Sequence, residues 1–274
     1  MSEAPESDKI FAGSIPEIYD EYLVPLIFEP YARDLAARLA SRPLTNVLEL
    51  AAGTGVVTRH LAATLPAGVS IVATDLNQPM LDRASRVGTT RAVDWRQADA
   101  MHLPFGDAGF DAVVCQFGVM FFPDKARAFA EARRVLRPGG VFLFNVWDRI
   151  EESEFSATIT DSLARMFPDN PPRFMARVPH GYHDAATISR DLAQGGFAAK
   201  PEIAAVTARS RAASPRIPAI AYCQGTPLRS EIEARDASRL SEATRVAEEA
   251  LIARFGRGPI DGRIQALVVS VDAP

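Results

Sequence analysis

The sequence of 274 residues contains few cysteines and no long apolar segment. The two cysteines, Cys115 and Cys223, lie far apart and form no Cys-x-x-Cys pair, which argues against a disulfide scaffold or a structural zinc site. No apolar run approaches the ~20 residues that a membrane-spanning helix requires. The first residues are polar and acidic, unlike a signal peptide. We therefore expect a cytoplasmic protein without a membrane span.

An excess of positive charge is also missing. Lysine and arginine together number 30 and aspartate and glutamate 34, so the formal net charge is −4 at pH 7. Because a surface that binds nucleic acid is usually basic, we expect no nucleic-acid partner. Hydrophobic residues make up 47% of the chain and charged residues 23%, which is the balance of an ordinary globular protein.

Strand-like and helix-like segments alternate in the middle of the chain. Short apolar runs, typical of buried parallel strands, are separated by stretches long enough for the helices that join such strands. The predicted strands are 45–51, 69–75, 92–98, 110–116 and 141–146, and the predicted helices are 54–65, 79–87 and 123–136. This alternation predicts a doubly wound α/β core over about residues 46–147.

The segments outside this core show a different pattern, which we interpret as additions to a single domain. Near the N-terminus, Pro25 and Pro30 are expected to break a helical run into short helices. Towards the C-terminus, a charged helix is expected over residues 229–255. The expected parts of the domain, 1–274, are N-terminal helices (15–40), the core (45–147, 184–208 and 262–272) and helical cap insertions (148–183 and 209–261).

Ligands of an open parallel sheet bind beyond the carboxyl ends of its strands, where this sequence places several motifs. In residues 49–55, small side chains would let a ligand approach the backbone at the start of a helix. Thr58 replaces the third glycine of a dinucleotide-binding motif, and no Lys-Ser/Thr pair completes a P-loop. A tight turn without a ligand is the alternative interpretation.

Polar side chains also end the next predicted strands. Asp75 could accept both hydroxyl groups of a ribose, or it could cap the following helix. Asp99 could accept a hydrogen bond from an exocyclic amine, with Leu103 and Phe105 as the walls of an adenine site, or it could stand in an ordinary turn. Gln116 begins an apolar stretch that suits either a pocket floor or the core.

Taken in order, these motifs resemble those of class I S-adenosylmethionine-dependent methyltransferases. The segments that carry the resemblance are 47–55, Asp75, 99–105, 110–113 and 134–140. The similarity covers about residues 45–147 and is greatest to the small-molecule branch that includes the quinone-biosynthesis C-methyltransferases. One departure is Ala51, where the family often has glycine. Because alanine is small, we expect cofactor binding to be retained.

The resemblance implies a Rossmann-like fold, a seven-stranded sheet with an antiparallel last strand, and S-adenosylmethionine as the cofactor without a metal. The cofactor-binding residues that it implies are Tyr22, Glu49, Ala51 and Gly53 for the methionine portion, Gly55 in the same turn, Asp75, Leu76 and Met80 for the ribose and adenine, Asp99 and Ala100 for the adenine edge, and Gln116 near the methyl group. The implied reaction is in-line methyl transfer to a small, largely apolar acceptor.

A general base is not required by such a reaction. Alignment of the reactants contributes about 7–11 kcal/mol, whereas a base adds roughly 10²–10⁴-fold in rate when the acceptor must lose a proton. His180 and Tyr182 are the candidate catalytic residues. The alternative functions are a catalytically silent nucleoside-binding protein and an RNA methyltransferase, while an NAD-dependent oxidoreductase is disfavoured by the missing glycine.

Apolar and aromatic residues of the two predicted insertions suggest an acceptor pocket. They are Phe155, Phe167, Phe174, Met175, Tyr182 and Tyr222. Pockets of this composition bind small, largely apolar ligands, although the same residues could simply attach the cap to the core. We therefore expect a small hydrophobic acceptor, of a phenolic or quinone-like kind, beneath a cap.

Overall fold

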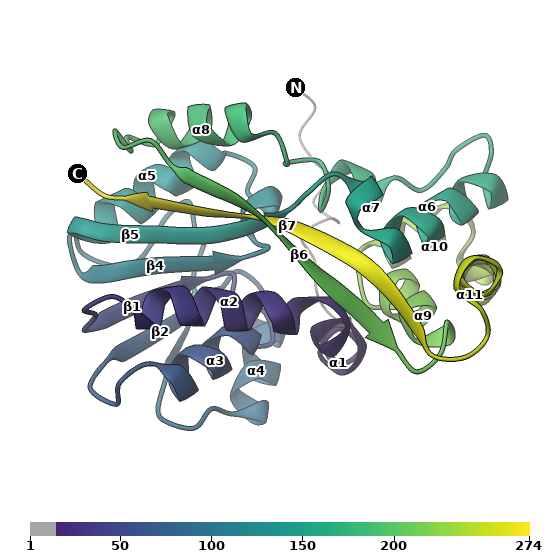
Figure 1. The fold of residues 1–274 in the computed structure, drawn as a ribbon, viewed down its shortest axis with the longest axis horizontal. Helices are drawn as coiled ribbons and strands as arrows, with labels where there is room; N and C mark the ends of the chain where they lie inside the picture. The colour runs from purple at the N-terminus through teal and green to yellow at the C-terminus, as the bar shows by residue number, and fades with distance from the viewer. Residues whose placement is uncertain (1–14) are drawn as a thin grey trace.

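The computed structural model describes residues 15–274, in which seven strands form one mixed sheet (Figure 1). The strands are β1 (Asn46–Leu50), β2 (Ser70–Asp75), β3 (Asp94–Gln97), β4 (Phe110–Gln116), β5 (Leu136–Trp147), β6 (Glu202–Ala212) and β7 (Ile260–Asp272). Their order is β3-β2-β1-β4-β5-β7-β6, and β7 runs antiparallel to both of its neighbours. The predicted doubly wound sheet with an antiparallel last strand is therefore confirmed.

The central strands are apolar because helices cover both faces of the sheet. Val47 and Leu48 of β1 and residues 112–115 of β4 are inaccessible to solvent, as expected of a buried parallel strand. The covering helices are α2 (Glu29–Ala40), α3 (Val56–Thr64), α4 (Gln78–Val87), α5 (Lys125–Val135) and α8 (Ala185–Gln194). The side chains of Asp124 and Asp184 cap α5 and α8 by accepting backbone N–H groups.

The N-terminal helical run does not break at Pro25. Helix α1 (Ile15–Ile18) leads into a π-helix, η2 (Tyr19–Phe28), which contains Pro25 and continues directly into α2. In an α-helix a proline ring collides with the carbonyl four residues earlier, whereas the hydrogen bonds of a π-helix span five residues and widen the turn. The prediction of a break at Pro25 is therefore wrong, while Pro30 lies in the first turn of α2, where proline is tolerated.

The wider turn of η2 also changes which side chains share a face. Residues nine positions apart in an α-helix are separated by about 2.5 turns and point in opposite directions. Tyr19 and Phe28 are nine positions apart, yet their rings stack with centroids 5.0 Å apart. The π-helix therefore turns both aromatic rings to the same side.

The cap helices gather at one end of the sheet. They surround the part of the antiparallel pair β6 and β7 that extends beyond β5 (Figure 1). These cap helices are η4 (Ile150–Glu152), α6 (Glu154–Met166), α7 (Phe174–Arg177), α9 (Arg216–Gln224), α10 (Leu228–Asp236), η5 (Ala237–Arg239) and α11 (Leu240–Phe255). Because β5 ends at Trp147 on this side, the cap helices lie beyond the carboxyl ends of the parallel strands.

The single helix expected over 229–255 is divided. Asp236 leaves the helical conformation, with φ −163° and ψ 106°, and its side chain accepts the backbone N–H of Ser238. Aspartate competes in this way with the helical hydrogen bonds, so one helix ends and another begins at this residue. Helix α9, which precedes this region, was not anticipated from the sequence.

Candidate active site

The turns that follow β1, β2, β3 and β4 enclose a pocket, here called the strand-tip pocket, of about 1080 Å³ including space open to solvent. Its lining residues are Tyr19, Ala51, Gly53, Asp75, Leu76, Asn77, Met80, Ala98, Asp99, Ala100, Met101, Gln116, Phe117, Gly118, Phe121, Phe122 and Pro123. The structure thus brings together most residues that the resemblance implies for the cofactor. Tyr22, Glu49 and Gly55 do not line this pocket.

The turn after β1 depends on left-handed backbone conformations. Ala51 has φ 52°, and Gly53 and Gly55 have φ 57° and 84°. A non-glycine residue in this region is strained by about 1–2 kcal/mol. A Cβ atom added to Gly118 would lie 2.5 Å from the Cβ of Ala51, so the missing side chain of Gly118 provides the space that the Ala51 methyl group fills.

Gly55 serves packing behind the pocket. A Cβ atom at this position would lie 2.9 Å from the Trp95 ring and 3.1 Å from the Cβ of Ala84. Because Gly55 has no Cβ atom, the start of α3 can pack closely against Trp95 of β3 and Ala84 of α4.

Asp75 joins the first two turns. Its Oδ2 accepts the backbone N–H of Gly53 at 2.8 Å, and its Oδ1 accepts that of Asn77 at 2.8 Å. Burial raises the pKa of its carboxyl group, while these hydrogen bonds oppose the increase. Asp75 was interpreted either as a ligand-binding residue or as a cap of the following helix. The structure supports both interpretations, because Asp75 borders the pocket and its side chain also binds the backbone at the start of α4.

Glu49 lies behind the pocket wall. It is 1% exposed, and its Oε2 accepts the hydroxyl hydrogen of Thr58 at 2.6 Å. Burial raises the pKa of this carboxyl group to about 8, although the bond from Thr58 and the charge of Arg59 favour ionisation. Glu49 thus holds a proton through the neutral pH range and can support the turn only indirectly.

The side of the pocket near β3 differs in part from the prediction. Asp99 lines it and accepts the backbone N–H of Met101 at 2.9 Å. Leu103 and Phe105, however, do not line it, so their assignment as adenine walls is wrong. Arg134 of α5 donates to the carbonyl oxygens of both residues and so ties this segment to α5.

Tyr19 takes the place predicted for Tyr22. Tyr19 lines the strand-tip pocket, whereas the pKa of the Tyr22 hydroxyl is raised mainly by a hydrogen bond with the adjacent Glu21, outside the pocket. Asp20 fastens this part of η2 to α4 through a 2.9 Å ion pair with Arg83. The phase of a π-helix cannot be recognised in the sequence, so the sequence pointed to Tyr22 although Tyr19 is the tyrosine that lines the pocket.

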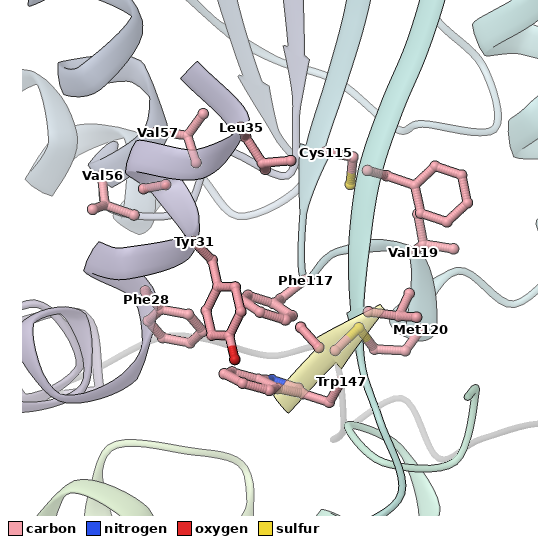
Figure 2. Packing of buried hydrophobic residues seen from close by; sticks show 14 of the residues in the cluster. Phe28, Tyr31, Leu35, Val56, Val57, Cys115, Phe117, Val119, Met120 and Trp147 are labelled. Carbon is pink, nitrogen blue, oxygen red and sulfur yellow. The ribbon is translucent and has the colours of Figure 1, made fainter. Parts of the chain in front are cut away.

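The turn after β4 places Phe117 beside Trp147 (Figure 2) and contributes Phe117 to the walls of both the strand-tip pocket and a second cavity. Phe117 has φ 50°, and its N–H group donates to Oδ1 of Asn145 at 2.9 Å. Its ring stacks on Trp147 with centroids 3.8 Å apart and an interplanar angle of 6°. Gln116, just before it, has a buried Oε1 without a hydrogen-bond partner in residues 15–274.

The second cavity, here called the apolar chamber, measures about 440 Å³ including open space. Its lining residues are Tyr19, Leu23, Ile27, Phe28, Phe117, Met120, Phe121, Trp147, Phe174, Met175, Pro179, Tyr222, Thr226 and Pro227. None of these side chains, all within the described part of the chain, is charged. Tyr19, Phe117 and Phe121 also line the strand-tip pocket, so the two cavities adjoin.

The expected cap aromatics divide between the chamber and the packing of the cap. Phe174, Met175 and Tyr222 line the chamber. Phe155 instead contacts Phe255, with centroids 5.0 Å apart, and Arg239 lies over the ring of Phe167. The cap aromatics were interpreted as pocket residues or as residues that attach the cap to the core. Some of them line the chamber and others pack within the cap.

The two candidate catalytic residues line neither cavity. The hydroxyl of Tyr182 donates to Asp191 at 2.9 Å, and Lys125 lies over its ring. His180 is 4% exposed, its Nδ1 is 2.7 Å from the carbonyl oxygen of Asp148, and burial lowers its pKa to about 4. This placement does not support a direct role in the reaction for either residue.

Two further searches apply to residues 15–274. They contain no group of three or more histidine, cysteine, aspartate or glutamate side chains that could hold a metal ion. No helix in this part of the chain is long and apolar enough to span a membrane.

Comparisons with known proteins agree with this architecture. A family model described as a methyltransferase domain matches residues 48–144. The ubiquinone/menaquinone biosynthesis C-methyltransferase UbiE of Ralstonia pickettii is 32% identical over 175 residues, which cover 59% of this chain and 70% of that protein. The chain belongs to the class I S-adenosylmethionine-dependent methyltransferases.

Another relative is matched over a shorter stretch, and solved structures are matched over most of the chain. The demethylmenaquinone methyltransferase of Lactiplantibacillus plantarum is 44% identical over 98 residues, or 34% of this chain and 41% of that protein. Among solved structures, phosphoethanolamine N-methyltransferase 2 of Haemonchus contortus has a TM-score of 0.57 at 16% identity, covering 95% of this chain and 57% of that one. YcgJ of Bacillus subtilis has a TM-score of 0.56 at 17% identity, covering 89% and 98%. These two structures show the shared fold.

The strand-tip pocket of this methyltransferase fits its cofactor, S-adenosylmethionine. Asp75 and Asp99 are its charged lining residues within the described chain, and no lysine or arginine lines it. A positively charged sulfonium is favoured by such walls, whereas the pyrophosphate of a dinucleotide would be repelled. The buried Oε1 of Gln116 adds an unpaired hydrogen-bond acceptor at the wall that leads to the apolar chamber.

Proposed function

We propose that this chain transfers the methyl group of S-adenosylmethionine to a small, uncharged and largely apolar acceptor bound in the apolar chamber. The observation that carries this proposal is the pair of adjoining cavities, one with acidic walls and the other without charge. Their shared wall, Phe117 and Phe121 with Tyr19, is where methyl donor and acceptor would meet.

In this proposal different residues of the strand-tip pocket bind the ribose, the adenine and the methionine portion of the cofactor. Asp75 accepts the ribose hydroxyl groups with the lone pairs that Gly53 and Asn77 leave free, and Asp99 with Ala100 binds the adenine edge. The remaining contacts are assigned to Leu76 and Met80 beside the ribose and adenine, and to Ala51, Gly53, Gln116 and Tyr19 along the methionine portion. Glu49 and Gly55 support the turn from behind. The bound cofactor supplies a sulfonium whose methyl group is open to nucleophilic attack.

The contribution of this chain to the reaction is then alignment and exclusion of water. Alignment alone accounts for about 7–11 kcal/mol. No histidine, aspartate, glutamate or lysine lines the chamber in the described residues, so a general base is not at hand. The proposal therefore favours an acceptor that needs little help to lose a proton, such as an acidic phenol or an enolisable ring carbon. The names of the quinone-biosynthesis relatives are in accord with an acceptor of this kind.

We further propose that core and cap form one domain. The chamber supports this proposal, because its walls combine η2, the tips of β4 and β5, and the cap helices α7 and α9. The two alternatives lack such support: a silent nucleoside-binding protein has no use for the adjoining chamber, and an RNA methyltransferase would need an accessible basic surface.

Calorimetry with S-adenosylmethionine and S-adenosylhomocysteine tests the first half of the proposal, with micromolar affinity as the expected result. Transfer of a labelled methyl group from S-adenosylmethionine to neutral phenols, to amines and to transfer RNA tests the second half. We expect label in the phenols alone. Absence of cofactor binding at millimolar ligand would refute the proposal, and label in transfer RNA would replace it with the RNA alternative.

A further inference from the structure

The apolar chamber contains a tyrosine hydroxyl group that forms no hydrogen bond within residues 15–274. Tyr222 lines the chamber from α9 and is 2% exposed. Within residues 15–274 no group forms a hydrogen bond with its hydroxyl. Its oxygen is not among the fully enclosed side-chain atoms that have no partner, so it borders the open space of the chamber. Tyr222 therefore has a free hydrogen-bond donor at the wall of a ligand-sized cavity.

Two other hydroxyl groups, one on the chamber wall and one behind it, are paired. The hydroxyl of Thr226 donates to the carbonyl oxygen of Tyr222 at 2.7 Å and accepts the N–H of Leu228 at 3.2 Å. Tyr31 packs edge-on against two rings of the wall, and its hydroxyl donates to the carbonyl oxygen of Val206 at 3.2 Å. Tyr31 and Tyr222 are thus two buried tyrosines of the same region, of which one has a protein partner and the other has none.

The chemistry of the chamber limits what could pair with Tyr222. Burial raises the pKa of its hydroxyl above the ordinary value, so the group remains protonated and can donate. The chamber provides no charged side chain to balance an ionised ligand, and burial of an unpaired charge is far more costly than burial of a neutral polar group. Aromatic rings such as Phe117 and Trp147 offer flat apolar faces on which a planar ligand can pack.

We propose that Tyr222 determines acceptor specificity by donating its hydroxyl hydrogen to an oxygen of a neutral aromatic acceptor. This inference rests on the proposed function, because it takes the apolar chamber as the acceptor site. Tyr222 selects aromatic rings that carry a carbonyl or similar oxygen over hydrocarbons of the same shape, and the absence of charge in the chamber disfavours amines and carboxylates.

The experiment compares two probes of nearly equal shape, acetophenone and α-methylstyrene, in which a C=O group is replaced by C=CH₂. Dissociation constants are measured by ligand-detected NMR titration of the full chain with saturating S-adenosylhomocysteine. We expect Tyr222→Phe to weaken acetophenone binding about 3- to 10-fold, the usual range for a neutral hydrogen bond, and to leave α-methylstyrene within about twofold. The matched control, Tyr31→Phe, should leave both dissociation constants unchanged.

Urea unfolding supplies a second readout that separates a ligand-binding role from a structural one. Tyr222→Phe should retain or increase the stability of the protein, because it removes an unpaired group, while Tyr31→Phe should decrease it. Equal effects of Tyr222→Phe on the two probes, or a loss of stability, would overturn the assignment of Tyr222 and leave cofactor binding intact. Failure of both probes to bind the wild-type protein would overturn it as well, whereas loss of cofactor binding by calorimetry would refute the proposed function itself.

Discussion

The two adjoining cavities are built in different ways. Nearly all the walls of the strand-tip pocket come from turns between residues 51 and 123, each directly after a strand of the central sheet. The apolar chamber combines η2, three residues after β4, the last residue of β5, and segments near 174–179 and 222–227. The first is therefore specified by short motifs and the second by long-range packing. The two should also respond differently to pH, to substitution and to added ligands.

The largest expected difference is in pH dependence. The pKa of Glu49 is raised to about 8, so the native state retains a proton that the unfolded chain loses near pH 4.5. The contribution of Glu49 to the free energy of unfolding should therefore fall as pH rises from about 4.5 to about 8 and then level off, by on the order of 5 kcal/mol. The buried His180, whose pKa is lowered from 6.5 to about 4, has the opposite effect over the acidic part of this range. The difference in free energy of unfolding between the wild type and Glu49→Gln, measured by urea unfolding across this pH range, isolates the Glu49 contribution.

Ligand binding in the chamber provides the contrast to this pH effect. The chamber walls have no titratable carboxyl, histidine or lysine among the described residues, and nearby His180 has a pKa lowered to about 4. Acetophenone binding should therefore be constant between pH 6 and pH 9, by NMR titration at saturating S-adenosylhomocysteine. A marked pH dependence would show that the cavities share a titrating group.

The next largest effect concerns Asp75 and the strand-tip pocket alone. Asp75→Ala should weaken S-adenosylhomocysteine binding by about 1.5–3 kcal/mol, the range for hydrogen bonds to a charged group. It should also lower stability, because the N–H groups of Gly53 and Asn77 lose their acceptor. Calorimetry measures the first effect, with the exposed Asp82→Ala on α4 as control. An unchanged affinity would mean that Asp75 serves only the turns.

A substitution beside Phe117 of the shared wall should affect both cavities. Gly118→Ala would place a methyl group 2.5 Å from the Cβ of Ala51 and 2.7 Å from the Sγ of Cys115. Such overpacking typically costs about 1–3 kcal/mol of stability, and binding of both ligands should weaken. Gly68→Ala is the control, since nothing lies within 4 Å of a Cβ atom there. Normal stability of Gly118→Ala would contradict the tight approach of the two turns.

The smallest expected effect concerns Tyr182. Removal of its hydroxyl deletes the bond to Asp191, so Tyr182→Phe should lower the free energy of unfolding by about 0.5–1.5 kcal/mol. Because Tyr182 lines neither cavity, the rate of methyl transfer to a phenol should remain within twofold of the wild type. A large loss of rate at unchanged stability would instead restore Tyr182 as a catalytic candidate.

The contrast between the cavities also explains what could be predicted from the sequence. Asp75, Asp99 and Gln116 were recognisable because each stands at or just beyond the carboxyl end of a parallel strand, and these ends converge. Leu103 and Phe105 follow the same rule in sequence but are tied to α5 by Arg134, which lies about 30 positions further along the chain. No local pattern reveals a contact of this kind.

The chamber was only partly predictable for the same reason. Phe174 and Phe155 are both apolar residues of the first predicted insertion, yet one lines the chamber and the other packs on Phe255. Their difference depends on how the cap helices dock, which involves α9 and α11 from the second insertion. Tyr19 was missed because the π-helix alters the spacing of residues on a face, and its sequence reads like that of an α-helix.

The pairing of Ala51 with Gly118 has a consequence for the order in which substitutions can be acquired. A side chain at position 118 collides with Cys115 whether or not position 51 carries a methyl group, whereas alanine at position 51 is accommodated only while position 118 has none. The dependence therefore runs in one direction. Ala51 therefore costs least in a chain that already carries glycine at 118, and reversion of Ala51 to glycine should be tolerated better than replacement of Gly118.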